Sequence, residues 1–105
     1  AASDVYKRQV MTRAVLDAAL SDAFSDAEVR ERVGATGDVT LERRIQHAVA
    51  ISAFHPAAKS AADQIRRVGN AAAHADLSLE VEPLSLLEAL QECIHALDQW
   101  DQSPT

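Results

Sequence analysis

An alanine-rich segment, residues 58–76, constrains the fold most strongly, because its apolar and polar side chains separate at helical spacing. At about 100° per residue, one side of the segment carries only small and aliphatic residues. These residues are Ala58, Ala61, Ala62, Ile65, Val68, Gly69 and Ala72. The opposite side carries Lys59, Asp63, Arg67, Asn70 and His74. The pattern predicts an amphipathic helix with one buried face.

Gly69 and Asn70 lie in the middle of this helix, although both residue types weaken helices. A glycine in a helix costs about 1 kcal/mol relative to alanine. The alanines at 71–73 add little side-chain area, which suits the close approach of another helix. We therefore expect either function or close packing to compensate here, with the second helix coming from this chain or from a second protomer.

The polar side of the segment allows two interpretations. It is either an ordinary solvated face, in which Asp63 and Arg67 form an i,i+4 pair of about 0.3 kcal/mol, or a site that handles phosphate. Arg67 and His74 lie about 20° apart around the helix and roughly 10.5 Å apart along its axis. Asn70 lies between them. This spacing places an arginine, an amide and an imidazole along one side of the helix.

Residues 62–74 resemble the signature "hydrophobic, Arg, x, x, Gly-Asn, x, Ala-Ala-His" of HEPN-like helical domains. The branch in question is of unknown function and is found in restriction and anti-phage proteins. The resemblance extends over most of residues 12–100, with a helix opening at 13–17, a stretch at 41–45 after a Gly-containing loop, and a closing Leu-rich helix. It implies a helical bundle that commonly dimerises. Active members cleave RNA without a metal or another cofactor.

Carried onto this chain, the resemblance implies that Arg67 and His74, with six residues between them, form the catalytic pair. The imidazole would move a proton and the guanidinium would stabilise negative charge on the phosphate, in a cleft shared by two protomers. Arg66 and Asn70 are the expected phosphate or RNA contacts. If Arg66 were the matching arginine, its angular offset from His74 would grow to about 80°, so Arg67 is the better match.

Two functions from different classes remain open. The first is a metal-independent endoribonuclease of a defence or toxin–antitoxin system. The second is a non-catalytic dimerisation or nucleotide- or nucleic-acid-binding module that accompanies a restriction or other nucleic-acid-processing enzyme. Val68 follows Arg67 where active members usually carry a polar residue, and the net charge of −6 argues against a broad nucleic-acid surface; both favour the module. Expected partners are a second copy, RNA or a nucleotide, and an upstream nuclease or helicase domain or an antitoxin.

Composition favours one all-α domain, an antiparallel bundle of four or five helices in the HEPN style. The 105 residues are 48% hydrophobic but only 4% aromatic, so aliphatic side chains must build the core. The lone Cys93 lies in an apolar helix and is interpreted as a small buried hydrophobe. The histidines show no metal-ligand spacing, and no apolar run reaches 18 residues, so we expect no metal, no membrane contact and a cytoplasmic location.

Residues 1–9 do not join the periodic pattern, and we expect a non-native or disordered tail there, followed by the domain at 10–102. The domain is expected to be the C-terminal part of a longer chain. Several residues mark the expected helix ends: Ser25 with Glu28 as a capping box, Gly34, Thr40, Pro56 and Pro83. The last helix is expected to bury Leu86, Leu87, Leu90, Ile94 and Leu97.

Overall fold

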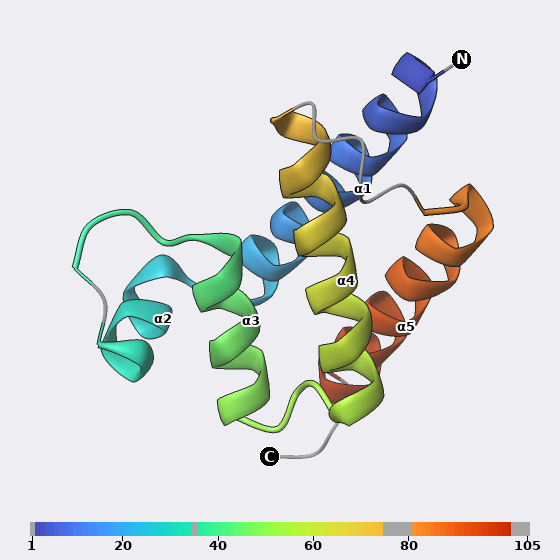
Figure 1. Cartoon of the computed structure of the whole chain (residues 1–105). Coiled ribbons are helices and arrows are strands. Elements are labelled where there is room, and N and C mark those ends of the chain that lie inside the picture. The colour runs from blue at the N-terminus through green and yellow to red at the C-terminus, as the bar shows by residue number, and fades with distance from the viewer. Residues whose placement is uncertain (1, 35, 75–80, 102–105) are drawn as a thin grey trace.

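A computed structural model of the chain describes residues 2–34, 36–74 and 81–101, and within these residues every regular element is a helix (Figure 1). The helices are α1 (Ala2–Ala23), α2 (Asp26–Val33), α3 (Leu41–Ala50), α4 (Pro56–Ala73) and α5 (Pro83–Asp101). The predicted all-helical bundle is confirmed. None of the helices in these ranges combines the length and the apolar character that a membrane span requires.

Local side chains set the helix ends, as the sequence predicts. The Ser25 hydroxyl accepts from the backbone N–H of Glu28, and the Glu28 carboxylate accepts from the backbone N–H of Ser25. Gly34 ends α2 at a φ of 66°, the left-handed conformation that glycine adopts without steric cost. The Thr40 side chain caps α3, and Pro56 occupies the first turn of α4.

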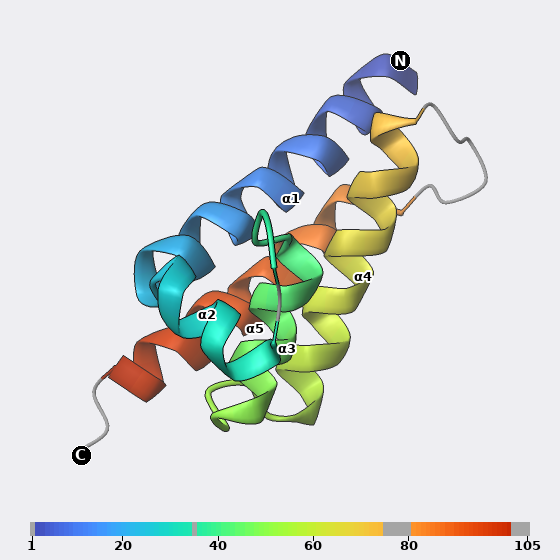
Figure 2. The ribbon, with the colours of Figure 1, turned by 90° about the vertical axis from the view of Figure 1, so that its left-hand side faces the viewer.

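Three long helices, α1, α4 and α5, pack against one another, and α2 and α3 cover one end of this group (Figures 1 and 2). α4 runs antiparallel to both α1 and α5, as expected for a bundle. α1 and α5 run in the same direction, so the antiparallel prediction applies to neighbours of α4 and not to every pair. At the far end of α5, the Trp100 ring packs edge-on against Phe24 with centroids 5.4 Å apart.

The buried face of α5 differs from the expected one. Leu87 and Ile94 are 50% and 41% exposed, so their predicted burial is wrong. The core residues of α5 are Leu86, Ala89, Cys93 and Ala96. Apolar residues surround much of this helix, so periodicity alone did not select the face. Small residues face α4, which allows close approach: the Cys93 thiol lies 3.6 Å from the backbone oxygen of Ala58. Cys93 is buried in the core, as predicted. Burial raises the pKa of its thiol to about 12.

Residues 2–9 are not a disordered tail, because they form the first turns of α1. Gln9 is fully buried, and its side-chain amide donates to the backbone oxygen of Val68 at 3.3 Å. Its side-chain oxygen accepts from the backbone N–H of Val81 at 3.3 Å. One amide therefore joins α1 to α4 and to the residues that lead into α5. Residue 1 and the expected domain boundary at residue 102 lie outside the described residues.

Arg44 connects three helices, α1, α2 and α3. Its Nε donates to Asp17 of α1 at 2.9 Å, and its Nη1 donates to Asp26 of α2 at 2.6 Å. The hydrogen bond from Arg44 lowers the pKa of the Asp26 carboxyl below its usual 3.8. A single guanidinium thus ties α3 to both preceding helices.

Candidate functional site

The candidate residues all lie at the C-terminal half of α4. The predicted buried face of this helix is confirmed, with Ala58, Ala62 and Ile65 fully buried and Val68, Gly69 and Ala72 nearly so. On the opposite side, Arg67, Asn70 and His74 are exposed. Arg66 lies between the two faces and is half-buried. The amphipathic pattern of the sequence therefore determines which candidate side chains reach the surface.

Gly69 marks the point where α1 crosses α4. A Cβ at this position would lie 2.6 Å from Cβ and 2.9 Å from Cδ of Arg13, distances that real Cβ atoms do not tolerate. The second helix expected beside Gly69 is therefore α1 of the same chain, and close packing accounts for the glycine. Ala71 and Ala72 are also buried within the chain, which removes much of the small-residue surface that suggested a second protomer.

Arg13 also contacts one of the predicted site residues. Its Nη1 donates to Oδ1 of Asn70 at 2.6 Å, a hydrogen bond between residues 57 positions apart in the sequence. The arginine stem lies over Gly69, and the guanidinium reaches the next residue of α4. Asn70 is thus oriented by Arg13 of α1.

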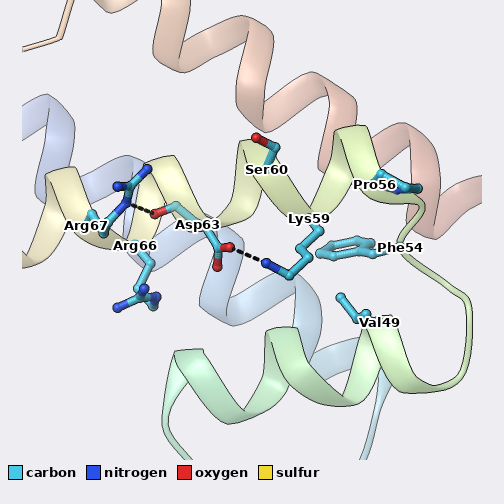
Figure 3. Close-up of a pocket in the computed structure, with 8 residues that line it drawn as sticks. All are labelled: Val49, Phe54, Pro56, Lys59, Ser60, Asp63, Arg66 and Arg67. Carbon is cyan, nitrogen blue, oxygen red and sulfur yellow. Dashed lines mark hydrogen bonds and ion pairs between the residues drawn. The ribbon is translucent and has the colours of Figure 1, made fainter.

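A groove between α3 and α4 contains the two adjacent arginines (Figure 3). The cavity measures about 600 Å³. Its lining residues are Val49, Phe54, Pro56, Lys59, Ser60, Asp63, Arg66 and Arg67. One end is apolar, at Phe54 and Pro56, and the other end carries the guanidinium groups. Arg66 extends toward α3, and Arg67 lies on the other side of α4 at the rim. A neighbouring depression of about 370 Å³ shares Arg66 and continues along α3.

The charges in this groove are not balanced within it. Lys59 Nζ binds the Asp63 carboxylate at 2.8 Å, so the expected Asp63 pairing with Arg67 is wrong. Arg67 Nε instead donates to the backbone oxygen of Asp63 at 3.4 Å, because its side chain folds back along its own helix. Arg66 Nε is buried and has no hydrogen-bond partner in the part of the chain that the structure describes. Both guanidiniums lack a carboxylate among these residues.

His74 lies apart from the groove. It is the C-cap residue of α4, and its backbone N–H donates to the backbone oxygens of Asn70 and Ala71, each at 3.2 Å. Its side chain is exposed and does not line the groove, and Arg67 lies about 10 Å away along the helix axis. The structure therefore brings Arg66 and Arg67 to one groove and Asn70 to Arg13, and it does not bring His74 to either.

The sequence analysis missed two contributors to this surface. Periodicity places Lys59 on the polar face but does not show that it neutralises Asp63. Arg13 belongs to another helix, and the signal that could have found its neighbourhood was Gly69, whose cost in a helix already indicated a close approach. Across residues 2–34, 36–74 and 81–101, no three side chains of His, Cys, Asp or Glu are grouped so that they could hold a metal ion.

Residues 3–100 match the family described as Domain of unknown function (DUF4145). The match covers α1 to α5 almost completely. No curated protein and no solved structure matches the chain.

Proposed function

This chain belongs to the family described as a domain of unknown function (DUF4145), and we propose that it is a binding module that holds a phosphate of single-stranded RNA in the α3–α4 groove. The observation that carries the proposal is the state of Arg66. Its Nε is buried and has no partner among the described residues, and its guanidinium lines an open cavity beside Arg67. A permanently charged group in this position can bind an anionic acceptor, and the described residues supply none.

Phosphate meets this requirement, which a neutral ligand does not. A guanidinium presents its donors in a planar fork that matches two phosphate oxygens, and it stays charged at all ordinary pH values. The Lys59 contact neutralises Asp63, so this carboxylate repels an incoming anion less than a free one would. With a net charge of −6, the chain must make such a contact locally rather than over a broad basic surface.

The geometry favours binding over cleavage. General acid–base catalysis requires the imidazole within hydrogen-bond reach of the proton that it moves, and His74 does not line the groove. The resemblance to HEPN-like domains adds the expectation that the module accompanies a restriction or other nucleic-acid-processing enzyme. Binding by the module would then hold RNA for a partner that performs the chemistry.

The test is binding of a fluorescently labelled, single-stranded oligouridylate at low salt, measured by anisotropy. Arg66→Gln and Arg67→Gln should each weaken binding about tenfold or more, because each removes a charged hydrogen bond to phosphate. Arg32→Gln is the matched control, since Arg32 is an exposed arginine of α2 that lines a different depression. Equal affinities for all four proteins would contradict the proposal.

Metal-independent cleavage of RNA is the second candidate. The observation that favours it is that Arg67, Asn70 and His74 are all exposed on one side of α4, where a second copy of the chain would complete a shared cleft. In that case the purified protein should cut labelled RNA in the presence of EDTA, and His74→Ala should abolish the cut while leaving the melting temperature unchanged. Intact RNA after incubation with wild type would leave only the binding module.

A further inference from the structure

The hydrogen bond between Arg13 and Asn70 fixes which side of the Asn70 amide faces solvent. A guanidinium has only donors, so the atom that it contacts must be the amide oxygen. The Nδ2 group of Asn70, with its two N–H donors, therefore points away from Arg13. Asn70 is exposed, so these donors are available to a ligand.

Arg13 itself retains donors beyond the one that it gives to Asn70. A guanidinium carries five N–H groups, and the structure assigns one contact to them. Arg13 is half-exposed, and no carboxylate pairs with it among the described residues. Toward the solvent, Arg13 and Asn70 thus present hydrogen-bond donors and a positive charge. The side-chain oxygen of Asn70 is already used by Arg13. The chemistry that complements such a surface is an anion rich in acceptors, such as a phosphodiester.

This donor surface lies one helical turn from Arg66. Residues 66 and 70 are separated by about 6 Å along α4 and by about 40° around it. The separation is comparable to that between consecutive phosphates of an extended single strand. We propose that Arg13 and Asn70 form a second phosphate subsite, and that the ligand of this domain is an oligonucleotide with at least two consecutive phosphates rather than a mononucleotide. This inference rests on the proposed binding of RNA phosphate at Arg66 and Arg67.

The close approach of α1 to α4 at Gly69 is the reason that the second subsite contains residues of both helices. The stem of Arg13 occupies the space that a side chain at residue 69 would fill. Because of this contact, a residue of α1 delivers its guanidinium to the surface of α4 beside Asn70. The second subsite consequently draws on α1 and α4, whereas the groove involves α3 and α4.

Two variants test the second subsite without disturbing the helix crossing. Asn70→Asp keeps an oxygen for Arg13 but replaces the outward N–H donors with a charged oxygen that repels phosphate. Arg13→Met keeps an unbranched stem over Gly69 and removes the charge. Each should weaken binding of the labelled oligouridylate about tenfold or more. Neither should change the affinity for uridine monophosphate, which occupies only the Arg66 subsite.

The salt dependence of binding separates a phosphate contact from an indirect effect on structure. Losing one phosphate contact to single-stranded RNA should reduce the slope of log K against log salt concentration by about 0.7. Arg13→Met should show this reduction, and Arg32→Gln, the distant control on α2, should not.

The outcomes distinguish the inference from the function on which it rests. If Arg66→Gln weakens binding while Arg13→Met and Asn70→Asp bind the oligouridylate as wild type does, the second subsite is wrong and the groove stands. Equal affinity of wild type for uridine monophosphate and the oligouridylate would also overturn the second subsite. If Arg66→Gln and Arg67→Gln both bind as wild type does, the proposed function fails, and the two-phosphate arrangement fails with it.

Discussion

Arg44 on α3 is buried and Arg66 on α4 is half-buried, but the surroundings of the two guanidiniums differ. Arg44 is 8% exposed and donates to two carboxylates, Asp17 at 2.9 Å and Asp26 at 2.6 Å. Arg66 lines the groove, and its buried Nε has no partner among the described residues. The hydrogen-bonding needs of the first guanidinium are met by neighbouring helices, and those of the second are not.

The difference separates a structural role from a binding role. A buried polar group without a partner costs about 1 to 3 kcal/mol, and a guanidinium cannot avoid the cost by losing its proton. The fold therefore gains stability from Arg44 and gains little from Arg66. A side chain that the folded chain leaves without an acceptor is available to a ligand that brings one.

Replacing Arg44 with methionine should give the largest loss of stability. Arg44→Met removes two charged hydrogen bonds and leaves Asp17 and Asp26 without their partner. Both carboxylates are about half exposed, so solvent compensates them in part, and we expect a loss of about 2 kcal/mol. Urea unfolding followed by circular dichroism measures it. A change below about 0.5 kcal/mol would mean that the Arg44 contacts do not hold α1, α2 and α3 together.

His47 extends the comparison to a buried side chain that can lose its charge. Its ring is 2% exposed, and neither nitrogen has a hydrogen-bond partner within the described residues. Burial lowers the pKa of His47 below its usual 6.5, Arg32 acts in the same direction, and Glu28, 3.7 Å away, opposes them. Unlike the Arg66 guanidinium, the His47 ring can lose its charge when it is buried, although its two nitrogens still lack partners among the described residues.

Stability should consequently fall as the pH is lowered from about 7 to about 5, because the unfolded chain takes up a proton at His47 before the folded chain does. The contribution of this one group is at most about 1.4 kcal/mol per pH unit. His47→Phe keeps a ring against Phe24 and should flatten the profile, as measured by urea unfolding at each pH. His95→Gln, at an exposed position of α5, is the control. Identical profiles for wild type and His47→Phe would show that His47 titrates alike in both states.

Arg66→Met should change stability much less than Arg44→Met does. The methionine retains the unbranched stem and removes the Nε that lacks a partner, so we expect a change within about 0.5 kcal/mol in either direction. The same unfolding experiment measures it, with Arg44→Met as the matched variant. A loss as large as that of Arg44→Met would show that Arg66 is structural, and the contrast between the two arginines would disappear.

The smallest effect is expected at the ion pair inside the groove. Lys59→Met breaks the exposed contact with Asp63, which as an i,i+4 pair contributes about 0.3 kcal/mol. The same variant uncovers the Asp63 carboxylate, so oligouridylate binding should weaken although stability hardly changes. Unfolding and anisotropy measurements on one preparation test both. Binding that is unchanged in this variant would mean that Asp63 does not face the ligand.

Helix positions could be predicted because their signals are local. The capping box of Ser25 and Glu28, the left-handed Gly34 and the first-turn Pro56 each act within a few residues of the end that they define. The buried face of α4 could likewise be predicted, because the polar and apolar residues of this helix lie on separate sides. α5 lacks such a separation, so the sequence did not exclude Leu87 and Ile94 from the core.

The sequence by itself determined an all-helical chain, the buried side of α4 and the exposure of Arg67, Asn70 and His74, because helical periodicity alone orients side chains around an axis. Only the tertiary structure decided their partners. The crossing of α1 over α4 places Arg13 beside Asn70. The position of α3 beside α4 forms the groove that Arg66 lines, where the described residues supply no acceptor. These contacts depend on how whole helices pack, and helix packing is the sum of many distant side chains rather than a property of any short segment.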